Sequence, residues 1–282
     1  GFPMIPSILP TYNRAPFSFV SGTGSWLTSD DGRRFLDLGA GIAVNSLGHA
    51  HPKLVAALTA QAGQLWHTSN LYHIPAQQKL ADQLVELTFA DTVFFTNSGT
   101  ECCELAVKMA RKYFYDKGQP ERVEIIAFEG AFHGRSSAGI AAAGSEKLTK
   151  GFGPLLPGFV HLPFADHDAL HAAVSDKTAA ILIEPIQGEG GVRVLDRAFL
   201  QGLRALTRER NVLLILDEIQ CGYGRTGTVF AYEQVGIEPD LLTIAKPMAA
   251  GPPMGAVLLS EAVAQAMQPG DHGTTFGCGP FV

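Results

Sequence analysis

Short apolar runs alternate with stretches of helical period from about residue 90 onward. This alternation predicts strands and helices in turn around a largely parallel sheet. The expected strands are Thr92–Thr96, Glu124–Phe128, Ala180–Glu184, Val212–Asp217, Leu241–Ala245 and Gly255–Ser260. The pattern therefore indicates an α/β fold.

The stretch between the runs Ala180–Glu184 and Val212–Asp217 predicts a crossover helix. Asp196 can cap it, and Phe199, Leu203 and Leu206 fall on one face. Nearer the N-terminus, helices are expected to begin at two prolines, because proline favours the first helical turn. One helix is expected to start at Pro52, with Leu54, Leu58 and Leu65 facing inward. The other is expected to start at Pro75, with Leu80, Leu84 and Leu87 facing inward.

Residues 1–50 have a different pattern. Glycines recur there, at Gly22, Gly24, Gly32, Gly39 and Gly41, and make the segment rich in turns. We expect a smaller lobe of hairpins and loops over residues 1–50 and the main domain over residues 51–282.

Composition and charge exclude several classes of partner. The 282 residues, 46% of them hydrophobic, can bury a substantial core. A net charge of −6 and the lack of a basic cluster argue against nucleic acid. The apolar runs are too short to span a bilayer and no signal pattern opens the chain, so we expect no membrane partner and a cytoplasmic location. The four cysteines form no CxxC pair, and no metal site is expected.

Polar residues at strand ends are the candidates for chemistry. Ser98 and Glu101 have capping-box spacing, which sets a helix N-terminus at residues 98–100. Backbone N–H groups at the positive end of a helix dipole can hold a phosphate. Taken alone, the same pattern also fits a plain helix cap.

Two further strand ends carry charge. Asp217 ends one apolar run at the edge where open α/β sheets place ligands, and it could meet a pyridinium nitrogen or cap the next turn. Strand alternation alone does not decide whether Asp217 or Glu218 faces the site. Lys246 ends another run, where burial would lower its pKa and favour attack on an aldehyde, although many strand-end lysines only reach solvent.

The motifs taken together point to one chemistry. Phe132 could lie on a ring, Arg135 could hold a carboxylate, and a Gly-rich loop follows Glu184. Asp217, which could pair with a ring nitrogen, and Lys246, which could attack an aldehyde, also lie at strand ends. Independent coincidence is a poor explanation for this set.

The order SGTE, FHGR, EPIQGEGG, DEIQ-x-GYGRTG, LTIAK, PMGAV and HGTTFG resembles the class III (subgroup II) aminotransferases of fold type I. The likeness runs from Gly22 to Gly279. It implies a mostly parallel large domain that binds pyridoxal 5′-phosphate (PLP), with N-terminal elements of the small lobe. Segments His67–Tyr72 and Phe132–Arg135 are similar to substrate-side segments of members that use N-acetylornithine.

The resemblance also implies roles for single residues. Lys246 would carry the cofactor and shuttle a proton, while Asp217 would bind the ring nitrogen. Arg135 would grip the α-carboxylate of the donor, and Glu189 would gate the second substrate. The other implied cofactor contacts are Ser98, Gly99, Thr100, Phe132, His133, Gln220 and, from a neighbouring subunit, Thr275; the other implied substrate contacts are Asn70, Tyr72 and Thr274.

The implied reaction moves the terminal amino group of N-acetylornithine, or a similar ω-amino acid, to 2-oxoglutarate in a cytoplasmic homodimer serving arginine biosynthesis. Ornithine, succinylornithine, 4-aminobutyrate and a carrier-bound aminoadipate semialdehyde are alternative donors. A PLP-dependent aminomutase of the glutamate-1-semialdehyde type is an alternative reaction.

The sequence departs from the family in two places. The loop after the lysine, Pro247–Gly251, is less glycine-rich than is usual. Family chains continue beyond Gly277 into a small C-terminal domain, which we expect to be absent here together with the arginine for 2-oxoglutarate. A PLP-binding chain without full transaminase activity is therefore a further alternative.

Overall fold

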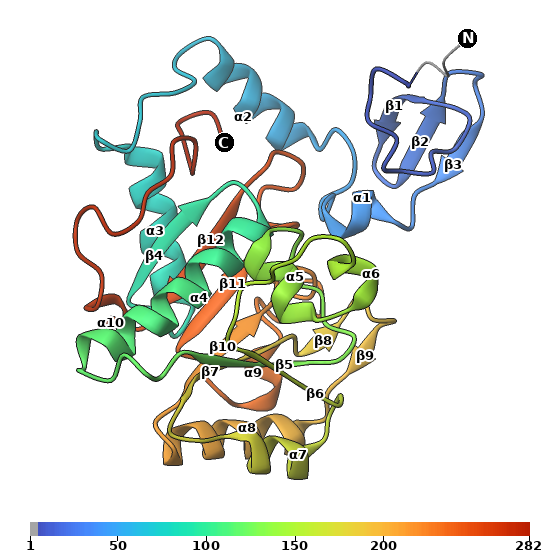
Figure 1. The fold of residues 1–282 in the computed structure, drawn as a ribbon. Coiled ribbons are helices and arrows are strands. Elements are labelled where there is room, and N and C mark those ends of the chain that lie inside the picture. The colour runs from blue at the N-terminus through green and yellow to red at the C-terminus, as the bar shows by residue number, and fades with distance from the viewer. Residues whose placement is uncertain (1–4) are drawn as a thin grey trace.

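The computed structural model describes residues 5–282 (Figure 1). The strands are β1 (Phe19–Thr23), β2 (Trp26–Ser29), β3 (Arg34–Leu36), β4 (Thr92–Thr96), β5 (Glu124–Phe128), β6 (Phe159–Leu162), β7 (Thr178–Ile183), β8 (Ile186–Gln187), β9 (Arg193–Val194), β10 (Leu213–Asp217), β11 (Leu241–Ile244) and β12 (Gly255–Leu259). The helices are α1 (Ala40–Ala43), α2 (Pro52–Ala62), α3 (Pro75–Leu87), α4 (Gly99–Asp116), α5 (Ser137–Ala143), α6 (Glu146–Thr149), α7 (His167–Ala173), α8 (Arg197–Glu209), α9 (Tyr232–Val235) and α10 (Glu261–Ala264).

A seven-stranded sheet forms the centre of the molecule, with the strand order β4-β12-β11-β10-β7-β5-β6. Only β12 is antiparallel to its neighbours, and the remaining pairs are parallel. All six predicted strands are present, with ends within two residues of those expected. The α/β prediction is confirmed. The edge strand β6 was not predicted, because its four residues include only one buried side chain.

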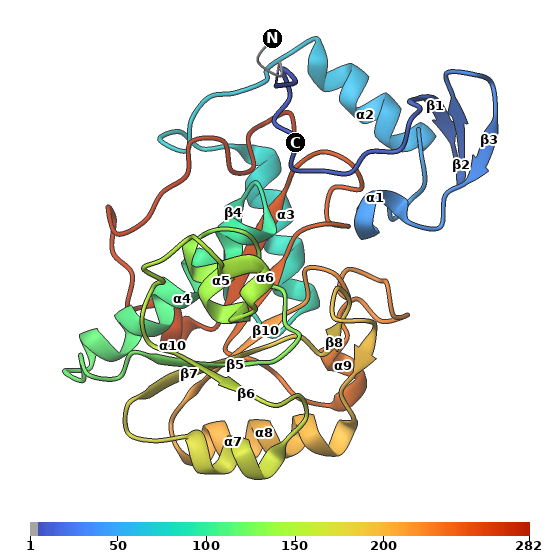
Figure 2. The ribbon, with the colours of Figure 1, turned by 45° about the vertical axis from the view of Figure 1, so that its right-hand side comes forward.

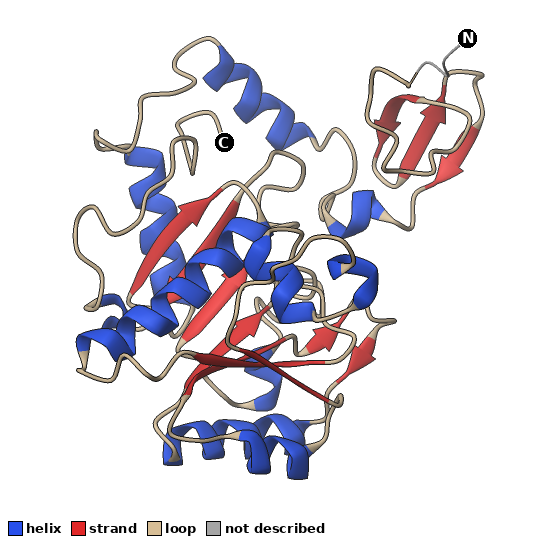
Figure 3. Cartoon of the chain, viewed as in Figure 1, coloured by secondary structure: helices blue, strands red, loops and turns tan. Residues whose placement is uncertain are grey.

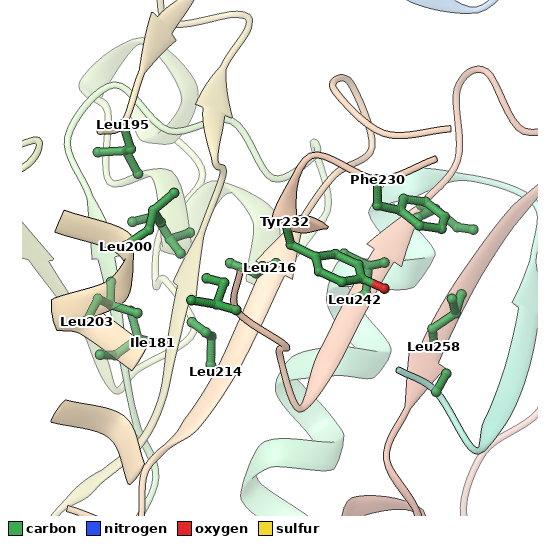
Figure 4. Close-up of a cluster of buried hydrophobic side chains, with 14 of the residues drawn as sticks. Ile181, Leu195, Leu200, Leu203, Leu214, Leu216, Phe230, Tyr232, Leu242 and Leu258 are labelled. Carbon is green, nitrogen blue, oxygen red and sulfur yellow. The ribbon is translucent and has the colours of Figure 1, made fainter. Parts of the chain in front are cut away.

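Helices cover both faces of this sheet (Figure 3). On one face, α4, α5 and α10 pack against Leu213 and Ile215 of β10. On the other face, α3, α7, α8 and α9 pack against Leu214 and Leu216 of the same strand. Figure 4 shows this second cluster, in which residues from α8 meet leucines of the central strands. Burial of both faces explains why the strand sequences are continuous apolar runs rather than alternating ones.

The crossover helix forms as predicted. α8 begins after Asp196, whose side chain accepts a hydrogen bond from the backbone N–H of Phe199 at 2.6 Å. Phe199, Leu203 and Leu206 are buried. The helix connects β7 to β10, which are parallel neighbours, and Figure 2 shows it beside α7 below the sheet.

The N-terminal segment forms a separate three-stranded antiparallel sheet, β1-β2-β3, which lies apart from the large sheet in Figure 1. This arrangement fits the expected lobe, although the boundary at residue 50 stays a prediction. The inward orientation expected for Leu65 and Leu87 is wrong. The two residues are 49% and 57% exposed. Helix α2 ends at Ala62, before Leu65, and has no buried residue. Periodicity shows which face of a helix is apolar, but a partner must cover that face to bury it.

No helix in the described part of the chain combines the length and the apolar character that a membrane crossing needs.

Candidate active site

A small cavity of about 120 Å³ lies at the carboxyl ends of the parallel strands. Its lining comes from the start of α4, the loop after β5, and the residues that follow β7, β10 and β11. The lining residues not predicted as cofactor contacts are Gly134, Glu184 and Ile219. The predicted contacts that line it are Gly99, Thr100, Phe132, His133, Asp217, Gln220 and Lys246.

The start of α4 lines one end of the cavity. Ser98 caps the helix, and its hydroxyl accepts from the backbone N–H of Glu101 at 3.4 Å and donates to the Glu101 carboxylate at 2.7 Å. The predicted cap by Ser98 is therefore present, but the Glu101 carboxylate accepts from the backbone N–H of Asn97 at 3.1 Å and not from that of Ser98, as a capping box would require. The first backbone N–H groups of a helix lack intrahelical acceptors, so those of Gly99 and Thr100 are available to a bound anion.

Glycine is required where the backbone closes around this end of the cavity. A Cβ atom on Gly99 would lie 2.8 Å from the side chain of Ile219. Gly134 has a φ of +104°, and a Cβ atom there would overlap the side chain of Thr100. Both positions let the segments around the cavity pack more closely than a larger residue would allow.

Asp217 is the strand-end acid that faces the cavity, which settles the choice left open by the sequence. Its carboxylate accepts hydrogen bonds from Nδ1 of His133 at 2.7 Å and from the backbone N–H of Ile219 at 3.0 Å. Glu218 is also buried, but it accepts from the backbone N–H groups of Ala231 and Tyr232 on the opposite side. Glu218 therefore fixes the loop before α9.

His133 is almost fully buried, at 1% exposure. Burial lowers its pKa, but the hydrogen bond and charge of Asp217 outweigh that effect, so the pKa of His133 is raised. Its Nε2 atom is buried without a hydrogen-bond partner among the described residues. His133 thus holds the Asp217 carboxylate in place through its Nδ1 atom.

Lys246 follows β11 and projects into the same cavity. Its Nζ atom lies 5.9 Å from the centre of the Phe132 ring. Burial lowers the pKa of Lys246, against the opposing charges of Asp217, Glu189 and Glu184. A lysine with a lowered pKa is a better nucleophile toward an aldehyde.

Glu184 is the lining residue whose role the sequence analysis missed. Its carboxylate accepts from the backbone N–H of Phe132 at 3.0 Å, which orients the loop that carries the aromatic ring. Burial raises the pKa of Glu184 to about 7. The available signal was its position after a buried strand, the same signal that marked Asp217.

The predicted substrate contacts lie outside this cavity. Arg135 is exposed, with its guanidinium carbon 5.9 Å from the centre of the Phe132 ring. Glu189 is exposed and lines an adjoining cavity that shares Gln220 with the first. Both therefore stand at the rim of the cavity, each near one of its lining residues.

A second group of predicted residues gathers elsewhere on the surface. The side-chain amide of Asn70 donates to the backbone carbonyl of Gly277 at 3.1 Å and weakly to that of Thr274 at 3.4 Å. Tyr72 and Thr275 are exposed. The structure joins Asn70 to Thr274, and none of these predicted residues lines the cavity.

Cys103, His133 and Asp217 also have potential metal-ligand atoms within 4.8 Å of one another. Burial, and then the charge of Asp217, raise the pKa of Cys103 well above its ordinary value. Because the thiolate is the form that binds metals, a protonated thiol here does not favour a metal ion. The expectation of no metal site stays a prediction.

The cavity has features that fit a phosphorylated pyridine aldehyde. A helix N-terminus for the phosphate, a buried carboxylate for a ring nitrogen, an aromatic side chain and a lysine of lowered pKa lie around one small space. The donor set therefore matches PLP.

Comparison with known proteins gives a consistent result. The family described as "Aminotransferase class-III" matches residues 10–282. Acetylornithine aminotransferase from Rhodobacter capsulatus is 66% identical, with 99% of this chain aligned to 71% of that protein. The enzyme of the same name from Methanocaldococcus jannaschii is 51% identical over 97% of this chain and 69% of its own length.

Solved structures of similar fold include two aminotransferases. Ornithine aminotransferase from Toxoplasma gondii superposes with a TM-score of 0.94 at 34% identity, over 98% of this chain and 66% of that one. N-acetylornithine aminotransferase from Stenotrophomonas maltophilia superposes with a TM-score of 0.81 at 40% identity, over 96% of this chain and 66% of that one. The chain thus spans about two thirds of the length of the proteins it matches.

Proposed function

The chain belongs to the class-III aminotransferase family, and from that premise we propose that it moves the terminal amino group of N-acetylornithine to 2-oxoglutarate. Its cofactor is PLP, the cofactor of this family. When bound, PLP supplies an aldehyde to react with amines and a protonated ring that accepts electrons. The substrates of an aminotransferase are small molecules, an amino donor and an oxo acid.

One observation carries the proposal: Lys246 and Asp217 line a single small cavity with the start of α4. In the proposed roles, the backbone N–H groups of Gly99 and Thr100 bind the phosphate. Asp217 keeps a proton on the ring nitrogen, and His133 holds Asp217 in place at 2.7 Å. Lys246 would hold the cofactor and, once released, would move a proton at its Nζ atom. Phe132 would lie against the ring and exclude water from it.

The donor is proposed from the relatives and from the rim of the cavity. Relatives that are 50–66% identical are named acetylornithine aminotransferases. Arg135 at the rim could bind an α-carboxylate through two parallel hydrogen bonds, which would leave the distal amine toward Lys246. The aminomutase alternative is not favoured, because the relatives named above are aminotransferases.

We also propose a homodimer that acts in the cytoplasm and serves arginine biosynthesis. Leu71, Tyr72 and Phe276 are 89%, 70% and 67% exposed, and they lie within two residues of Asn70 or Gly277, which are joined by a hydrogen bond. Large exposed apolar side chains that gather on one surface favour association with a partner. Thr275 lies on this surface, from which it could reach the phosphate site of a second subunit. Sedimentation of wild type and of a Phe276→Ser variant would test the dimer.

The proposed reaction can be tested in two steps. Adding N-acetylornithine alone to the PLP-loaded chain should change the cofactor absorbance in a single turnover. Adding 2-oxoglutarate as well should give glutamate in steady state. Ornithine, succinylornithine and 4-aminobutyrate serve as competing donors, and a higher kcat/KM for any of them would overturn the proposed donor. Conversion of glutamate-1-semialdehyde without an oxo acid would support the aminomutase instead.

A further inference from the structure

Cys103 is a buried residue that the proposed chemistry does not use. It lies in the second turn of α4, the helix whose first turn forms the phosphate site, and it is 1% exposed. Its side chain packs with Ile219 and Ala245 beneath the cavity. Its sulfur lies 3.5 Å from Oδ2 of Asp217. One side chain therefore connects the phosphate-binding helix to the ring-nitrogen acid.

The thiol acts as a donor in this contact. Burial and the neighbouring charge of Asp217 keep it protonated, since both raise the pKa of Cys103. A carboxylate can only accept, so the S–H group must donate to Asp217. The distance of 3.5 Å is appropriate for a hydrogen bond to sulfur.

The donors around Asp217 determine the direction left for a ligand. A carboxylate has about four acceptor positions. Oδ1 accepts from the backbone N–H of Ile219, and Oδ2 accepts from His133 and from Cys103. These contacts come from three different segments of the chain. Together they fix the plane of the carboxylate and leave one acceptor position for a donor in the cavity.

We propose that Cys103 is a positioning residue, whose thiol orients the Asp217 carboxylate toward the cofactor ring nitrogen. The inference rests on the proposed role of Asp217. Cys103 does not touch the substrate or the cofactor in this arrangement. It acts through Asp217, and its removal weakens the bond between Asp217 and the ring nitrogen.

The chain offers a matched control in the preceding residue. Cys102 is also on α4 and fully buried, but its thiol contacts Thr96 and the backbone carbonyl of Ile244 rather than Asp217. Cys102→Ala therefore creates a similar small cavity on the same helix without changing the donors of Asp217. Cys103→Ser keeps a donor, whereas Cys103→Ala and Cys103→Val remove it.

The test compares two cofactors in equilibrium dialysis. One is PLP, and the other is its 1-deaza analogue, in which C–H replaces the ring nitrogen. The dissociation constant of the analogue divided by that of PLP measures how much the bond from the ring nitrogen to Asp217 contributes to binding. We expect Cys103→Ala to reduce this ratio roughly three- to tenfold (about 0.7–1.4 kcal/mol) and to leave the affinity for the analogue unchanged. Cys103→Ser and Cys102→Ala should retain the wild-type ratio.

The outcomes separate the inference from its premise. If Cys103→Ala retains the wild-type ratio, or weakens both cofactors equally, then Cys103 only fills space and the inference is wrong. If the wild-type chain itself binds PLP and the analogue equally, the role of Asp217 fails, and the inference fails with it. The melting temperature of the cofactor-free protein shows whether Cys103→Ala folds. If it does not fold, Cys103→Val removes the thiol without leaving a cavity, and the same measurement is made on that variant.

Discussion

Replacing Asp217 by Asn removes one negative charge from the base of the cavity and keeps the side-chain volume. The Asp217 side chain is 3% exposed, so water cannot compensate for the lost charge. The remaining amide oxygen can still accept from the backbone N–H of Ile219, now 3.0 Å from Oδ1. The amide nitrogen, in contrast, would replace the oxygen that accepts from His133 at 2.7 Å.

Two effects of this substitution can be separated. Loss of a buried hydrogen bond to a charged group costs about 1.5–3 kcal/mol of stability, reduced if His133 changes tautomer and accepts from the new amide. The catalytic effect is larger, because a ring-nitrogen charge partner matters most in the transition state. We expect a fall of roughly 10²–10⁴-fold in rate, about 3–5 kcal/mol of barrier, as for other preorganised charges.

The measurement is a single turnover of the PLP-loaded variant with saturating N-acetylornithine, followed by absorbance. Cofactor occupancy must be matched between the variant and wild type, because binding also changes. A single-turnover rate within threefold of wild type, which is about 0.7 kcal/mol of barrier, would refute the reasoning. Asp217 would then be a structural acid and not the partner of the ring nitrogen.

Three further predictions follow from the cavity and its surroundings. Lys246→Ala should abolish the PLP adduct that borohydride fixes to the chain, and mass spectrometry that finds a wild-type adduct would disprove the assignment. Arg135→Lys keeps the charge but loses the planar fork, so kcat/KM for N-acetylornithine should fall roughly tenfold or more, and less for ω-amines without an α-carboxylate; equal falls would indicate a structural role. Burial raises the pKa of Glu218 from 4.5 to about 7, so the free energy of unfolding that this group contributes is lost as pH rises from about 4.5 to about 7. In Glu218→Gln, the free energy of unfolding should fall less over this pH range, by an amount on the order of 3 kcal/mol. Urea unfolding at several pH values measures this difference, and the same pH dependence in the variant and wild type would contradict the prediction.

The order and type of the main elements could be predicted from the sequence because their signals are local. Apolar runs of strand length predict six strands of the large sheet, all but the edge strand β6. Asp196 and Ser98 cap helices through bonds that span three residues. Such patterns act within a few residues of chain. The motif order indicated the family for the same reason, since each motif is a short segment at a strand end.

The tertiary structure alone decided how these segments meet. The choice between Asp217 and Glu218 depended on His133, which is 84 positions away from Asp217 in the sequence. The part played by Glu184 depended on the backbone of Phe132, 52 positions away. The exposure of Leu65 showed that an apolar position is buried only when another segment covers it. Contacts of this kind are absent from any short window of sequence, because they form only when distant strand ends reach the same edge of the sheet.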